Sequence, residues 1–167
     1  IGIRTILSPL LPSWGTSNAA ATLVGQNLGA GKPERAEAAA WKAGLYNTVF
    51  LGTIGLSFLL FAPRLIAIFT SDPDVARYGV GCLRIVSFGF AFSGYGMVLT
   101  QAFNGAGDTR TPTWINMVVL WLWEIPLAWF LSTTGGFGPT GAFIAVSIAF
   151  ITLTAVSSWV ISRGHTK

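Results

Sequence analysis

Long stretches without a charged residue constrain this chain more than any other feature of its sequence. Such stretches occupy residues 5–31, 43–63, 85–107 and 125–162. A helix needs roughly 20 apolar residues to cross about 30 Å of hydrocarbon, and each stretch reaches that length. In lipid, a helix satisfies its own backbone polar groups. The pattern therefore predicts an all-α fold, a polytopic bundle of transmembrane helices.

The composition leads to the same class of protein. Of the 167 residues, 52% are hydrophobic and only 10% are charged, whereas soluble domains contain about 25% charged residues. Ten basic and six acidic side chains are too few to cover a soluble fold, so a lipid bilayer is the expected partner. The net charge is +4, but the basic residues are scattered, and no run of them favours nucleic-acid binding.

Turn signals divide the apolar sequence into five predicted spans. The spans cover residues 5–28, 41–62, 77–104, 112–132 and 140–162. The first span ends at Gly29 and Gly31 and the third at Gly105 and Gly107, because glycine is the preferred residue just beyond a helix C-terminus.

Proline positions refine the first two spans. Pro9 and Pro12 predict a kink or a later start for the first helix. Pro33 predicts a short amphipathic surface helix over residues 33–42, since proline is favoured at the first helical position. Pro63 is expected to end the second span.

Short polar residues mark the starts of the other helices. Asp72, which precedes Pro73, is expected to cap the third helix. Thr111 and Thr140 are the expected caps of the fourth and fifth helices. Asp108 in the turn before the fourth helix is a further capping candidate.

Five spans place the two ends of the chain on opposite faces of the membrane. Basic residues favour the cytoplasmic side. If the turns at 29–42 and 105–111 and the C-terminus are cytoplasmic, that side holds Lys32, Arg35, Lys42, Arg110, Arg163 and Lys167. The other side then holds Arg4, Arg64, Arg77 and Arg84. We therefore expect a multi-pass protein of the inner (cell) membrane with a cytoplasmic C-terminus.

Two predicted helix ends repeat one pattern. Residues 26–31 read QNLGAG and residues 101–107 read QAFNGAG. Two explanations of this repeat are equally good. Either it is a generic helix C-terminus, or it is a shared hinge. In the hinge, the glycines allow the helices to move; they are Gly29, Gly31, Gly105 and Gly107.

Three segments carry a resemblance to a known family. They are residues 23–36 (LVGQNLGAGKPERA), residues 101–112 (QAFNGAGDTRTP) and residues 123–128 (WEIPLA). Together they resemble the multidrug and toxic compound extrusion (MATE) family of secondary transporters. The resemblance implies twelve helices in two six-helix lobes, with this chain supplying helices eight to twelve. The chain opens on Ile1 rather than methionine, so we expect a partial C-terminal lobe whose partner is a missing N-terminal lobe.

The resemblance also implies a function. Members of the family export cationic or amphipathic drugs and toxins from the cytoplasm by antiport against protons or sodium ions. A small-molecule substrate and a coupling ion, H+ or Na+, are therefore expected, and no organic cofactor. Sodium-linked members carry an acid on helix ten, but the third predicted helix has only Asp74, at its start.

Glu124 is the most informative single residue. It lies about twelve residues into the fourth predicted span, where a carboxyl group is costly and marks a functional site by default. Burial disfavours the charged form, which suits a group that gains and loses a proton. It could also attract a cationic substrate. The alternative is a structural glutamate beside Pro126, whose missing N–H frees the carbonyl of Leu122.

Uncharged polar and aromatic side chains are further candidates for binding a substrate or ion. They are Asn47, Gln101, Asn104 and Asn116, together with Tyr46 and Tyr95, whose rings suit aromatic cations. Helix packing is the alternative role of the amides, because interhelical hydrogen bonds stabilise membrane proteins by about 0.6 kcal/mol on average.

Other functions remain open at this point. A lipid-linked-sugar flippase of related fold is expected to have a basic cavity, and only Arg84 offers a basic group near membrane depth. A non-transporting scaffold subunit leaves Glu124 unexplained. An intramembrane enzyme or metal site is disfavoured, since the one histidine, His165, lies in the polar tail.

Overall fold

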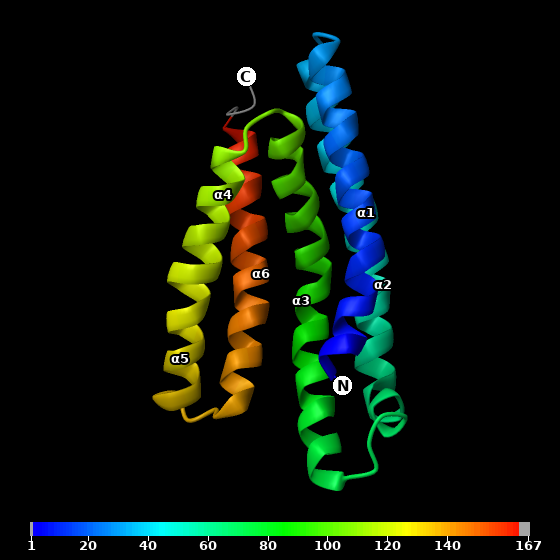
Figure 1. Cartoon of the computed structure of the whole chain (residues 1–167), viewed down its shortest axis with the longest axis vertical. Helices are drawn as coiled ribbons and strands as arrows, with labels where there is room; N and C mark the ends of the chain where they lie inside the picture. Colours follow the sequence, from blue (N-terminus) through cyan, green and yellow to red (C-terminus); the bar gives the residue numbers. More distant parts are fainter. Residues whose placement is uncertain (1, 164–167) are drawn as a thin grey trace.

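The computed structural model describes residues 2–163 as a bundle of long helices with steep, similar tilts (Figure 1). Four of its elements are α1 (Gly2–Gly29), α2 (Pro33–Ala67), α3 (Pro73–Gly105) and α6 (Pro139–Ser162). Between α3 and α6 the chain forms one uninterrupted helical run of three parts, α4 (Arg110–Asn116), the π-helical segment η1 (Met117–Glu124) and α5 (Ile125–Thr133). No strand occurs within residues 2–163.

The helices form two groups that meet along α3 and α6. Helices α1 and α2 pack against each other and against α3, whereas the α4–η1–α5 run packs mainly against α6. Helix α3 joins the groups through its long contact with α6. Figure 1 shows α1, α2 and α3 on one side and α4, α5 and α6 on the other. Among the described residues, α1 makes no packing contact with α4, η1, α5 or α6.

Four helical segments of the described chain are long and apolar enough to cross a membrane. They are Pro33–Ala67, Pro73–Gly105, Arg110–Thr133 and Pro139–Ser162. The prediction of an all-α, polytopic membrane bundle is thus confirmed. Helix α1 is not among these four, so a span over residues 5–28 stays a prediction. Figure 1 nevertheless shows α1 lying alongside α2 and α3 over most of its length.

Proline neither delays the start of the first helix nor ends the second. Helix α1 already begins at Gly2 and includes Pro9 and Pro12, so a later start is wrong. Helix α2 runs as one element from Pro33 through Pro63 to Ala67. The separate surface helix over residues 33–42 and the end at Pro63 are therefore both wrong.

A single buried stripe explains the continuity of α2. Its members follow one another at helical spacing and include Ala36, Ala40, Gly44, Asn47 and Leu51. Because the stripe passes from the amphipathic start into the apolar part, the same packing orders both. Pro63 removes only one backbone hydrogen bond, in the penultimate turn, and its fixed φ suits a helix.

The third helix starts as predicted. Asp72 has an extended backbone (φ −75°, ψ 121°). Its carboxylate accepts hydrogen bonds from the N–H groups of Asp74 at 2.9 Å and Val75 at 3.3 Å. Asp72 is therefore the N-cap of α3, with Pro73 at the first helical position.

The other two predicted caps are wrong. Helix α4 begins one residue before Thr111, and Asp108 caps it by accepting from the N–H groups of Arg110 at 3.1 Å and Thr111 at 3.0 Å. The Thr111 hydroxyl donates to the same Asp108 carboxylate. Helix α6 begins at Pro139 after Gly138, with no side-chain cap. Thr140 already lies inside the helix, because proline starts a helix without needing a hydrogen-bonded N–H.

The two Gly-Ala-Gly turns close in the same way. After α1, the N–H of Gly31 bonds the carbonyl of Leu28 and that of Lys32 bonds Asn27, both at 2.9 Å. After α3, Gly107 bonds Asn104 and Asp108 bonds Phe103, both at 3.0 Å. These are paired Schellman bonds. They need a positive φ at the second glycine of each turn, which is 69° at Gly31 and 83° at Gly107.

The first glycines of the two turns differ in their surroundings. A Cβ atom at Gly105 would lie 2.2 Å from the carbonyl oxygen of Ala21 on α1. A Cβ at Gly25 would in turn lie 2.9 Å from the carbonyl oxygen of Gly105. Gly29, the counterpart of Gly105, has open space around it. Gly105 thus permits the close contact of α1 with α3, whereas Gly29 has no such role.

Gly105→Ala is expected to destabilise the purified protein by about 1–3 kcal/mol, because the added methyl meets the α1 backbone. Gly29→Ala, the matched change in the other turn, is expected to be neutral or to stabilise by up to about 1 kcal/mol, since alanine favours a helix over glycine. Melting temperatures of both variants in detergent check this. Equal melting temperatures would show that the α1–α3 contact is not tight.

Candidate functional site

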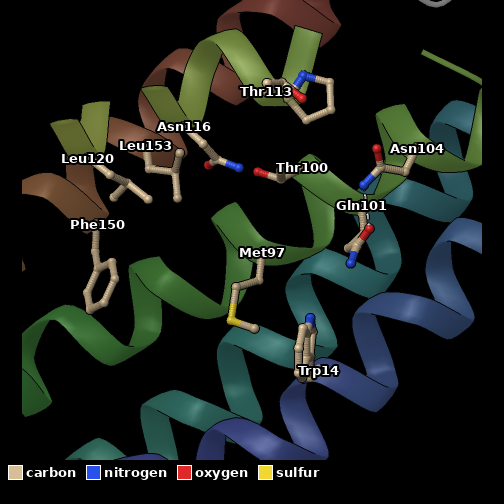
Figure 2. Close-up of a pocket in the computed structure, with 11 residues that line it drawn as sticks. Trp14, Met97, Thr100, Gln101, Asn104, Thr113, Asn116, Leu120, Phe150 and Leu153 are labelled. Atoms are coloured by element: carbon tan, nitrogen blue, oxygen red, sulfur yellow. Dashed lines mark hydrogen bonds between the residues drawn. The ribbon is translucent and has the colours of Figure 1, made fainter. Parts of the chain in front are cut away.

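A cavity of about 360 Å³ lies between the two groups of helices (Figure 2). Helices α1 and α3 supply one side of its wall, α4 and η1 supply the other, and α6 completes it. The lining residues are Trp14, Met97, Thr100, Gln101, Asn104, Pro112, Thr113, Asn116, Leu120, Phe150 and Leu153. All eleven are uncharged.

A row of three amides crosses from α3 to α1 at this cavity. The Asn104 side-chain N–H donates to Gln101 Oε1 at 2.6 Å, and Gln101 Nε2 donates to Asn18 Oδ1 at 3.2 Å. Each amide group has two N–H donors and a carbonyl oxygen with two lone pairs. The row therefore keeps further donors and acceptors that a bound molecule can use.

The structure brings together three of the predicted binding residues. Gln101 and Asn104 come from the last turns of α3, and Asn116 comes from the end of α4. Figure 2 shows Asn116 pointing across the cavity toward Thr100 on α3. The Thr100 hydroxyl donates to the Gly96 carbonyl of its own helix at 2.8 Å. Amides from two helix groups thus face a common space.

Asn47 lies in the protein core rather than at the cavity. Its side chain is 0% exposed. The amide nitrogen donates to Ser13 Oγ on α1 and to the Gly94 carbonyl on α3, both at 2.8 Å. Among the described residues its Oδ1 has no hydrogen-bond partner. Asn47 therefore holds three helices together, so its role is helix packing rather than substrate binding.

The remaining candidates also lie away from the cavity wall. Tyr46 projects from α2 with 70% of its surface exposed. The Tyr95 ring packs against the Trp41 ring, with centroids 5.9 Å apart, and covers Gly44. Glu124 is half-buried at the end of η1. No hydrogen bond or ion pair joins its carboxylate to the residues whose side chains the structure describes.

Sequence reasoning missed several residues of the wall, above all Trp14, Met97, Thr100 and Thr113. Helical spacing was the available signal. Residues 97, 100, 101 and 104 share one face of α3, and residues 113, 116 and 120 follow one face of the next run. Counting polar residues by face rather than by type would have grouped Thr100 with Gln101.

These features define a class: a polytopic α-helical membrane protein with an uncharged, amide-lined cavity between two helix groups. A family model, MatE, matches residues 1–130. The chain belongs to the MatE family, which confirms the resemblance seen in its sequence.

Individual relatives agree with this assignment. The "Probable multidrug resistance protein NorM" of Thermotoga maritima is 29% identical over 146 residues, which are 87% of this chain and 32% of the relative. "Protein DETOXIFICATION 5" of Arabidopsis thaliana is 29% identical over 154 residues, with the same two shares, 87% and 32%. The chain thus spans about a third of the length of these relatives.

A solved structure shows the same fold. It is described as an inward-facing conformation of a multidrug resistance MATE family transporter of the MOP superfamily. It superposes with a TM-score of 0.89 over 97% of this chain and 38% of the transporter chain, at 19% sequence identity. At that identity the match supports the fold of the helix bundle and not the chemistry of its cavity.

Cysteine labelling tests the position of the cavity. In a Cys82→Ser background, Thr100→Cys is expected to react with a water-soluble maleimide at least about tenfold faster than Val98→Cys, because thiol reactivity requires exposure. Both positions lie on α3, but Thr100 lines the cavity and Val98 is 0% exposed. Equal labelling rates at the two positions would contradict this cavity. The rates are measured by mass shift.

Proposed function

We propose that this chain forms most of one lobe of a membrane exporter for cationic or amphipathic drugs and toxins, and that the cavity is part of the substrate path. The observation that supports this most is an amide-lined, uncharged cavity between helix groups in a chain of the MatE family. The relatives named as multidrug resistance proteins are about three times as long as the matched region. A second lobe is the partner this proposal requires.

The cavity wall suits a flat or bulky organic cation. Trp14 is 56% exposed and offers an indole face. A cation over such a face gains about 0.5–1 kcal/mol, and about 2 kcal/mol when water is removed. The carbonyl oxygens of Gln101, Asn104 and Asn116 can accept hydrogen bonds from ring N–H or amino groups. Without a charged partner in this wall, the substrate is held loosely enough to be released.

The described cavity does not favour a lipid-linked-sugar flippase. Such a protein must hold a phosphate group, for which basic side chains are the usual partners. Arg84, the basic residue nearest to membrane depth, is exposed on α3 and is not part of the wall. A scaffold subunit needs no polar cavity at all.

The arrangement of the turns supports a cytoplasmic C-terminus in an inner (cell) membrane. Figure 1 shows the α1–α2 turn, the α3–α4 turn and the end of α6 at the same end of the bundle. Lys32, Arg35 and Arg110 lie in or beside those two turns, and Arg163 follows α6. Positively charged residues near helix ends favour the cytoplasmic side. The proposed cytoplasmic entry to the cavity is therefore near Asn104.

We further propose that inward flow of protons or sodium ions drives export, with Glu124 as the proton-binding group of this lobe. Glu124 is the only acid within Arg110–Thr133, and it ends the π-helical segment that carries Leu120 into the cavity wall. Glu124 lies outside the wall, so its protonation acts through the helix and not by contact with the substrate.

The full-length protein, expressed in cells lacking their own pumps, is expected to export ethidium against its gradient. Collapsing the proton and sodium gradients together is expected to abolish export, because secondary transport has no other energy source. Loss of ethidium fluorescence from preloaded cells measures the rate. Efflux that persists without either gradient would contradict the antiport proposal.

Glu124→Gln is expected to flatten the pH dependence of efflux while ethidium binding changes less than about twofold, because an amide binds no proton and the residue lies outside the wall. The matched control is Glu37→Gln on the exposed start of α2. The Glu37 carboxylate accepts from Trp41 Nε1 at 3.1 Å, and glutamine keeps that acceptor. Wild-type transport and pH dependence in Glu124→Gln would leave Glu124 with a structural role.

A further inference from the structure

Met97 connects the cavity wall to the buried core. Its side chain lines the cavity, and Figure 2 shows its thioether extending from α3 toward Trp14 on α1. Its Sδ atom also accepts a hydrogen bond from the hydroxyl of Ser13 at 3.8 Å. Ser13 is 0% exposed and is not part of the wall. Ser13, a core residue of α1, therefore contacts a wall residue on the side away from the cavity.

The direction of this hydrogen bond is set one residue further from the cavity. Ser13 Oγ accepts from the side-chain nitrogen of Asn47 at 2.8 Å, and the same nitrogen donates its other hydrogen to the Gly94 carbonyl at 2.8 Å. A serine hydroxyl has a single hydrogen. Since Asn47 can only donate here, that hydrogen remains for the Met97 sulfur. Asn47, Ser13 and Met97 thus form a directed chain from the core to the cavity.

This hydrogen-bond chain affects how the cavity recognises a substrate. Methionine has three rotatable bonds, and its polarisable thioether fits many shapes, which suits promiscuous binding surfaces. A hydrogen bond to its sulfur selects one orientation among these. We propose that Ser13 and Asn47, which do not touch the cavity, determine its selectivity among organic cations by holding Met97 in one orientation. This inference rests on the proposed function of the cavity in drug binding.

Ser17 provides a matched control on the same helix. It lies one turn after Ser13 and is also 0% exposed. Its hydroxyl donates to the backbone carbonyl of Ser13 at 2.9 Å and makes no hydrogen bond to Met97 among the described residues. Ser17→Ala therefore removes a buried hydroxyl group, as Ser13→Ala does, but it leaves the hydrogen bond to the Met97 sulfur in place.

The test compares two cations of different shape, planar ethidium and tetrahedral tetraphenylphosphonium, on the full-length protein. The ratio of their dissociation constants, and of their KM values for efflux, is expected to shift at least about threefold in Ser13→Ala, because groups in one hydrogen-bond chain are coupled. Ser17→Ala keeps the wild-type ratio. Met97→Leu removes the sulfur acceptor at nearly constant volume and shifts the ratio in the same way. Ser13→Ala then adds no further shift in the Met97→Leu background.

Three outcomes separate the possibilities. A wild-type ratio in Ser13→Ala, or an equal shift in Ser17→Ala, overturns the inference and leaves the proposed function standing. A wild-type protein that neither binds nor exports either cation defeats the proposed function itself. Asn47→Ala, which removes the donor to Ser13, is compared in the same assay. Because it also removes a bond between three helices, its melting temperature is measured alongside. Met97→Leu, which leaves that bond intact, decides the case if the Asn47 variant does not fold.

Discussion

Asn47 is the point on which the packing of the first three helices depends. From inside α2 it bonds Ser13 of α1 and the Gly94 carbonyl of α3. Lipid tails are as apolar as leucine, so hydrophobicity does not select how membrane helices pack; close approach and polar bonds do. Gly94 makes the approach possible, because a Cβ there would lie 2.9 Å from the backbone carbonyl oxygen of Asn47. The rotation of α3 about its axis follows from this contact, and so does the face that α3 presents to the cavity.

The other side of α3 packs closely on α6. A Cβ at Gly96 would lie 2.8 Å from the Thr154 hydroxyl oxygen. Ser147 on α6 donates to the Ile85 carbonyl at 2.8 Å. Glycines on two sides of one helix therefore bring α1–α2 and α6 close to it. The space between α1 and α4–η1 is left open, since those elements do not pack together within the described residues.

Local signals predicted the elements well where the chemistry was itself local. The Asp72 cap needs only the N–H groups that follow it, and the two Gly-Ala-Gly turns need only a residue that accepts a positive φ. The predicted Thr111 and Thr140 caps failed for a local reason, because Asp108 and Pro139 start those helices instead. Packing decided the outcome elsewhere. Pro63 did not end α2, because tertiary contacts order the residues on both sides of it. Gly29 and Gly105 occupy equivalent positions in sequence, yet only Gly105 meets another helix.

The sequence by itself determined that this chain is a bundle of membrane helices, because a helix of that length satisfies its own backbone polar groups in lipid. Its motifs carried the resemblance to the MatE family, which the family model then confirmed. It also identified Gln101, Asn104 and Asn116 as polar groups within those helices. Only the tertiary structure decided that these three share a cavity with Trp14 and Met97, while Asn47 serves the core. The physical reason is that in a membrane helix apolar residues cover every face, so hydrophobicity does not mark the buried side. Contacts between residues far apart in the chain, such as Gly105 with Ala21, set the rotation of each helix and thereby the residues that meet.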